Sequence, residues 1–131
     1  MLRVQTKTDE VTENLAHKVI GCCMNVHREL GPGLVEQIYQ RAVELELKIA
    51  GIAFEREKRF KVIYRDKCLY VHRLDLVVEE RLMIELKAVD RLHPVHVAQA
   101  LSCLRISKLP LCLLMNFNAA VLKDGIRRVV L

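Results

Sequence analysis

The segment from Arg81 to Phe117 constrains the fold more than any other part of the sequence. Two apolar runs, 81–88 and 109–117, are typical of buried strands. Between them, Pro94 stands where proline is favoured in a first helical turn, which predicts a helix reaching about Ser107. Two strands joined through a helix lie parallel when they share a sheet. The sequence therefore predicts at least one parallel strand pair.

Two helices and several further strands are predicted around this segment. Apolar residues recur every three or four positions over 9–30 and over 34–50, a spacing typical of helices that bury one face, and a Gly-Pro-Gly turn separates them. The other predicted strands are 54–64, 68–78 and an edge strand at 126–131. Together these elements predict an α/β (or α+β) fold in which helices flank a mixed central sheet.

Length and composition set the class of protein. A chain of 131 residues is expected to form a single domain over 1–131. A content of 52% hydrophobic and 28% charged residues excludes a disordered chain. The net charge of +5 permits a polyanionic partner such as nucleic acid without identifying one.

The sequence also favours a cytoplasmic location. The first fifteen residues include Asp9, Glu10 and Glu13 and lack a continuous apolar core, so no secretory signal is expected. No uncharged apolar stretch approaches the roughly 18 residues of a membrane helix, so no membrane association is expected. The 5 cysteines form no Cys-x-x-Cys pair, which disfavours disulfides and structural zinc and predicts reduced thiols that fill the core.

Charged side chains within the predicted strands are the first candidates for chemistry. Glu85 and Lys87 alternate with Leu86, so both project from the same face of a strand. If Asp75 lies near Glu85 across the hairpin, two carboxylates converge with a lysine, and such a set can hold a hard divalent cation. An ordinary ion-pair network on a half-exposed sheet is the alternative interpretation, and spacing alone does not exclude it.

Several longer motifs accompany these residues. One reads Gly33-Leu-Val-Glu36-Gln-Ile-Tyr39, and the others lie at 26–32, 73–76, 84–89, 94–99, 116–118 and 122–126. In their order along nearly the whole chain, these motifs resemble the GxxExxY proteins of the PD-(D/E)XK nuclease superfamily. The resemblance implies a restriction-endonuclease-like core and metal-dependent hydrolysis of phosphodiester bonds in nucleic acid, with DNA as the expected substrate.

The resemblance also implies a role for each site residue. Asp75, Glu85 and Glu36 would supply carboxylates to a Mg²⁺ or Mn²⁺ ion, and the carbonyl of Leu86 would supply a further oxygen. Lys87 would steady the attacking water and the developing charge on the phosphate. Glu36, Asp75, Glu85 and Lys87 are therefore the expected catalytic residues.

Three further residues are expected to orient the substrate. Gln99 matches the start of the Gln-x-x-x-Tyr motif of the superfamily, although Cys103 stands where tyrosine would follow. His96 is expected to help line the cleft, while capping or surface roles are the alternative for it and for His93. Tyr39 lies almost one helical turn after Glu36, so its hydroxyl is expected either to orient that carboxylate or to contact substrate.

Two hypotheses about function follow from these residues. The leading one is a Mg²⁺-dependent nuclease, and the competing one is a nucleic-acid-binding or protein-interaction module that keeps the fold without turnover. The basic residues at 56, 58, 59, 61, 65 and 67 could track phosphates, or they could form an ordinary solvated strand face. Many small domains of the superfamily pair, so the resemblance also suggests a homodimer.

Overall fold

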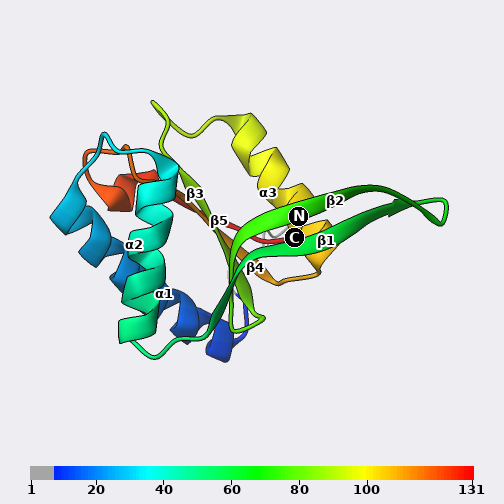
Figure 1. The fold of residues 1–131 in the computed structure, drawn as a ribbon, viewed down its shortest axis with the longest axis horizontal. Helices are drawn as coiled ribbons and strands as arrows, with labels where there is room; N and C mark the ends of the chain where they lie inside the picture. Colours follow the sequence, from blue (N-terminus) through cyan, green and yellow to red (C-terminus); the bar gives the residue numbers. More distant parts are fainter. Residues whose placement is uncertain (1–7) are drawn as a thin grey trace, which may run out of the picture.

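The computed structural model describes residues 8–131, and Figure 1 shows its course. The elements in chain order are α1 (Glu10–Leu30), α2 (Glu36–Ile49), β1 (Phe54–Tyr64), β2 (Lys67–Val78), β3 (Leu82–Lys87), α3 (Pro94–Ser107), β4 (Leu111–Asn116), a short 3₁₀ helix η1 (Leu122–Gly125) and β5 (Ile126–Val129). Residues 1–7, which belong to the segment where no secretory signal was expected, lie outside the described residues.

The strands form one mixed sheet in the order β1-β2-β3-β4-β5. β3 and β4 are parallel and are joined through α3, while the other neighbouring pairs are antiparallel. The parallel pair predicted from the 81–117 segment is thus confirmed. The tail forms the predicted edge strand beside β4, although it ends at Val129, and the short helix η1 precedes it.

Helices cover both faces of the sheet, with α1 and α2 on one side and α3 on the other (Figure 1). Alternate residues of each central strand point to opposite faces, so the sheet separates two apolar clusters. The cluster under α1 and α2 includes Val19, Val43, Leu47, Leu76, Ile84, Leu86 and Leu113. The cluster under α3 includes Leu74, Val77, Met83, Ala100, Leu104, Cys112 and Leu114. This layering confirms the predicted mixed sheet flanked by helices.

The β1–β2 hairpin is longer than the rest of the sheet. β2 pairs with β3 only over 76–78, but it pairs with β1 out to Lys67 and Tyr64. Residues 59–73 therefore form a two-stranded extension, which Figure 1 shows projecting away from the helices. We call these residues the arm.

The cysteines match the predicted core thiols with one exception. All five are free, and Cys22, Cys23, Cys103 and Cys112 are buried. Cys68 is exposed, which corrects that expectation, because it lies near the tip of the arm, where no other layer covers the strands. No helix within residues 8–131 is long and apolar enough to span a membrane.

Candidate active site

Asp75 and Glu85 meet where β2 and β3 separate. The last paired residues of this hairpin are Leu76 and Ile84, so Asp75 and Glu85 follow directly in the same register. Beyond that pair the backbone ladder is replaced by a side-chain contact, in which the Leu86 amide donates to Asp75 Oδ2 over 3.2 Å. The hairpin geometry that the sequence predicted thus brings the two acidic residues together.

Lys87 completes the group at the carboxyl end of β3. Its Nζ lies 3.6 Å from Glu85 Oε1, and the two side chains keep only 20% and 16% of their surface exposed. Strand alternation places both side chains on the face that α3 covers, beyond Met83 of the α3-side cluster. The ion pair is therefore largely shielded from water, on a part of β3 that still pairs with β4 but lies just beyond the ladder with β2.

Burial controls the ionisation of both acids. Desolvation raises the pKa of Asp75, an effect that the Leu86 amide and Lys87 oppose and that the Glu36 charge reinforces. Desolvation also raises the pKa of Glu85, with Lys87 opposing and Asp75 reinforcing the shift. Glu85 Oε2 is buried without a hydrogen-bond partner. A buried carboxylate oxygen without a partner, next to a second carboxyl group whose pKa is also raised, costs free energy unless a cation or a proton binds to it.

Glu36 reaches the same end of the sheet from the first residue of α2. Its Oε1 accepts a hydrogen bond from the Ala88 amide over 3.3 Å, directly after β3 ends. The charge of Glu36 also acts on Asp75, so the two carboxylates lie at the same end of the sheet. Leu86 contributes its amide to Asp75, while its side chain is buried under α1 and α2.

Two residues that the sequence did not single out surround Asp75. Gln40, one helical turn after Glu36, donates to the Asp75 carbonyl over 3.5 Å. Glu57 lies opposite Asp75 at a gap in the β1–β2 register, and its φ of 51° is the left-handed conformation that disrupts a ladder. The Glu57 charge adds to the raised pKa of Asp75. Helical spacing from Glu36 could have indicated Gln40, whereas no sequence signal marked Glu57.

A pocket opens between the sheet and α3. It has a volume of about 480 Å³ and is lined by His72, Glu85, Lys87, Val95, Ala98, Gln99, Ser102, Cys103 and Ile106. Gln99, a predicted substrate-orienting residue, is exposed on this wall. The pocket therefore joins the Glu85–Lys87 pair to the helix that carries the Gln-x-x-x-Cys variant of the motif.

Cys103, in place of tyrosine, contacts a histidine of the arm. Its Sγ lies 3.2 Å from His72 Nε2. Burial, with the nearby charges of Glu85 and Asp75, raises the pKa of the Cys103 thiol to about 11. The raised pKa favours the protonated thiol in contact with the His72 ring. No sequence signal marked His72, because this contact depends on how α3 packs against the arm.

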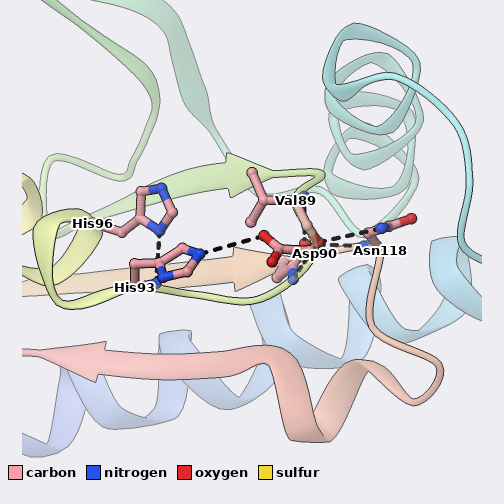
Figure 2. A network of polar contacts seen from close by, with 6 residues as sticks. Val89, Asp90, His93, His96 and Asn118 are labelled. Atoms are coloured by element: carbon pink, nitrogen blue, oxygen red, sulfur yellow. Dashed lines mark hydrogen bonds and ion pairs between the residues drawn. The ribbon is translucent and has the colours of Figure 1, made fainter.

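The other predicted histidine stabilises the start of α3. Figure 2 shows His96 Nδ1 accepting the hydrogen bond of the His93 amide, at 2.9 Å, and His93 Nε2 lying 3.4 Å from Asp90 Oδ1. These contacts match the capping alternative for both histidines. His96 therefore fixes the helix on which Gln99 lies.

Asparagines of the 116–118 motif hold the loop after β3. The Asn116 side chain accepts from the Val89 amide and donates to its carbonyl, both over 3.0 Å. The Asn118 amide group also donates to the Val89 carbonyl over 3.2 Å (Figure 2), and its Oδ1 accepts from the Gly33 amide over 3.1 Å. This network ties the loop after β3 to the turn before α2, so it sets the distance between Glu36 and the strand end.

Tyr39 contacts the turn before α2 from inside the core. It is fully buried and stacks on Phe117 with 4.8 Å between ring centroids. Its hydroxyl donates to the Gly31 carbonyl over 2.5 Å and accepts from the Leu34 amide over 3.1 Å. These partners direct the hydroxyl to the turn and not to the Glu36 carboxylate.

The residues present fit a hard cation. Within residues 8–131, no three His, Cys, Asp or Glu side chains are arranged as a complete metal cage. Nevertheless, the donors near Glu85 Oε2 are oxygen atoms of carboxylates, the ligand type that Mg²⁺ and Mn²⁺ prefer. Asp75 and Glu85 are the candidate ligands, because Glu85 Oε2 is buried without a partner and the charge of Asp75 acts directly on Glu85.

Comparison with known proteins identifies the family. Searches of curated proteins and of solved structures found no match. A family model described as the PD-(D/E)XK nuclease superfamily matches residues 13–129, which include every strand of the sheet and all the site residues above. The chain belongs to this superfamily, as a GxxExxY-type member whose helix-flanked mixed sheet is consistent with the restriction-endonuclease-like core.

Proposed function

We propose that this protein is a metal-dependent nuclease that hydrolyses phosphodiester bonds of nucleic acid, with DNA as the expected substrate. The observation that carries the proposal is the shielded group of Asp75, Glu85 and Lys87, in which Glu85 Oε2 lacks a partner. Membership of the nuclease superfamily supplies the reaction class. A purely structural ion pair needs only one carboxylate and one ammonium group. It does not explain why a second carboxyl group with a raised pKa lies beside it, or why one carboxylate oxygen has no partner.

The proposed metal ligands are Asp75 and Glu85, with the Leu86 carbonyl and Glu36 as further oxygen donors. A bound Mg²⁺ or Mn²⁺ ion would supply an activated water and would offset charge on the phosphate. Lys87 holds its ammonium group at the pocket, where it would stabilise negative charge that develops on the phosphate oxygens. Asp75, Glu85 and Lys87 lie on two neighbouring strands of one sheet, so they need little rearrangement when substrate binds.

The predicted orienting residues take two different parts in this proposal. Gln99 lines the pocket, so its amide can contact the nucleotide directly. His96 and Tyr39 would act at a distance, because His96 fixes the start of α3 and Tyr39 fixes the turn before Glu36. They are proposed as positioning residues.

A binding module without turnover is the second candidate. The observation that favours it is Cys103, whose thiol is engaged with His72 where the superfamily motif has a tyrosine. Such a module would keep the basic surface and the fold while losing contacts that help the reaction.

Cleavage assays with matched metal conditions test the proposal. The purified protein would be incubated with labelled single-stranded, duplex and branched DNA and with RNA, in Mg²⁺, Mn²⁺ or EDTA. We expect cleavage that requires Mg²⁺ or Mn²⁺ and is lost in Asp75→Asn, whereas Glu10→Gln, an acid-to-amide change on the exposed start of α1, should leave it intact. Metal-independent cleavage, or equal cleavage by Asp75→Asn, would contradict the proposed site. Binding without cleavage would favour the binding module.

A further inference from the structure

The arm concentrates positive charge on a hairpin whose base packs against α3 at Phe60 and His72. Residues 59–73 contain the cations Arg59, Lys61, Arg65, Lys67 and Arg73 against a single acid, Asp66. All of these charged side chains are exposed. Since the whole chain has a net charge of +5, the arm carries most of the excess. A polyanion is the partner that this charge attracts.

The two faces of the arm differ in chemistry. Cross-strand partners share a face, and the register pairs Arg59 with Arg73 on one face. On the other face, the register pairs Phe60 with His72 and Val62 with Tyr70. We call this second side the aromatic face. It presents flat rings on a ribbon whose opposite side is basic.

The outer part of the aromatic face is open to solvent. Tyr70 is 62% exposed, and its ring centroid lies 6.2 Å from that of His72. His72 is half-buried against α3, so the exposed apolar surface here is chiefly the Tyr70 ring, which a flat partner could cover. Nucleic-acid bases are such a partner, because any base can stack on an aromatic side chain.

The aromatic face leads into the pocket of the candidate active site. His72 is followed two residues later by the buried Leu74, and its ring lines the pocket together with Glu85 and Lys87. A chain of rings therefore runs from Tyr70 through His72 to the pair of charged residues. A strand that stacks on Tyr70 and His72 would be continuous with the proposed reaction site.

We infer that the aromatic face of the arm binds unpaired nucleotides and leads that strand to Glu85 and Lys87. Tyr70 and His72 stack on successive bases, while the long side chains of Arg59, Lys61 and Arg73 reach around the narrow ribbon to the phosphates. Bases within a duplex are already stacked on their neighbours, so this face selects unpaired strands. The inference rests on the proposed function and specifies its substrate. A second copy is disfavoured as the occupant because it would bring a second cationic arm.

Binding measurements without divalent metal test the arm separately from catalysis. Fluorescence anisotropy in EDTA would compare a labelled oligothymidylate with a duplex of the same length. We expect tighter binding to the oligothymidylate, and Tyr70→Ala should weaken it about fivefold or more, the loss of one stacked base. Tyr70→Phe keeps the ring and should bind like the parent protein. Ile49→Ala removes a side chain that is 79% exposed on α2 and serves as the matched control.

Several outcomes would overturn the inference. Unchanged oligothymidylate binding by Tyr70→Ala, or equal weakening of duplex binding, would contradict a stacking face for unpaired strands. A dimer in sedimentation that Tyr70→Ala dissociates would identify a second copy as the occupant instead. If Tyr70→Ala binds normally while Asp75→Asn alone stops cleavage, the nuclease proposal stands and the arm inference fails. If Tyr70→Ala weakens binding by a parent protein that never cleaves, the arm inference stands and the nuclease proposal fails.

Discussion

The two faces of β3 differ in chemistry, since one is apolar and the other carries charged side chains. On one face, Leu82, Ile84 and Leu86 are fully buried under α1 and α2. On the other, Met83 is followed by Glu85 and Lys87, which face the pocket under α3. Two helices cover the first face and one covers the second. The comparison indicates that the free energy gained by burying the apolar face holds β3 in position. The opposite face can then carry charged side chains whose burial costs free energy.

The largest expected effect belongs to the apolar face. Leu86→Ala removes a side chain that is 1% exposed between the sheet and the helices. Truncation of a buried leucine leaves a cavity and costs about 2–5 kcal/mol of the free energy of unfolding. Denaturant unfolding would measure the loss, with Leu45→Ala on the exposed side of α2 as a control. A loss below about 1 kcal/mol would mean that this face does not anchor β3.

Lys87→Ala tests the charged face. We expect cleavage to fall at least about 100-fold, the usual cost of losing a group that stabilises transition-state charge. Nucleic-acid binding should weaken because a cation is lost, whereas Asp75→Asn should hold or tighten binding because an anion is lost. Steady-state cleavage and anisotropy would be measured on variants with normal circular dichroism. Equal cleavage by Lys87→Ala and the parent protein would contradict the assigned role.

Asp75→Asn should also stabilise the fold, in contrast to Leu86→Ala. The folded-state pKa of Asp75 is raised chiefly by burial, so its ionised form costs stability at every pH above the unfolded-state pKa. The amide keeps an oxygen for the Leu86 amide hydrogen bond and removes the buried charge. We expect the free energy of unfolding to rise by about 0.5–2 kcal/mol at neutral pH, the usual size of a single stabilising substitution.

The gain from Asp75→Asn should depend on pH. As the pH falls through the raised pKa, the carboxyl group of the parent protein binds a proton and its cost disappears. The difference in free energy of unfolding between variant and parent should therefore shrink toward acid pH. Melting curves across that range would measure it. A difference that grows on acidification would mean that the ionised carboxylate stabilises the fold.

Local patterns were sufficient to predict most of the fold and part of the site. Alternation placed Glu85 and Lys87 on one strand face, and the start of α3 follows from Pro94. The proximity of Asp75 to Glu85, just beyond the last paired residues of the hairpin, follows from the short turn between β2 and β3. Each of these features depends on neighbours in the chain.

Features that depend on distant contacts were not predictable in the same way. His72 meets Cys103 only because α3 packs beside the arm. Glu57 interrupts the ladder with a left-handed backbone, a conformation that favours glycine or asparagine and that a glutamate gives no sign of in the sequence. Tyr39 was expected near Glu36 or the substrate from helical spacing, yet its hydroxyl satisfies the turn that precedes α2. In each case the packing of another element decides which partner a polar side chain finds.

The smallest expected effect concerns the turn that links the two faces. Tyr39→Phe keeps the ring on Phe117 but removes the hydroxyl that contacts the Gly31 carbonyl and the Leu34 amide. We expect a loss of about 1 kcal/mol in the free energy of unfolding. If the turn positions Glu36, cleavage should fall modestly while oligothymidylate binding in EDTA stays unchanged, because the arm lies elsewhere. Ile49→Ala, on the exposed end of α2 and outside the arm, is the control. A loss of stability without any change in cleavage would mean that Tyr39 contributes only to folding and that its turn does not position Glu36 for the reaction.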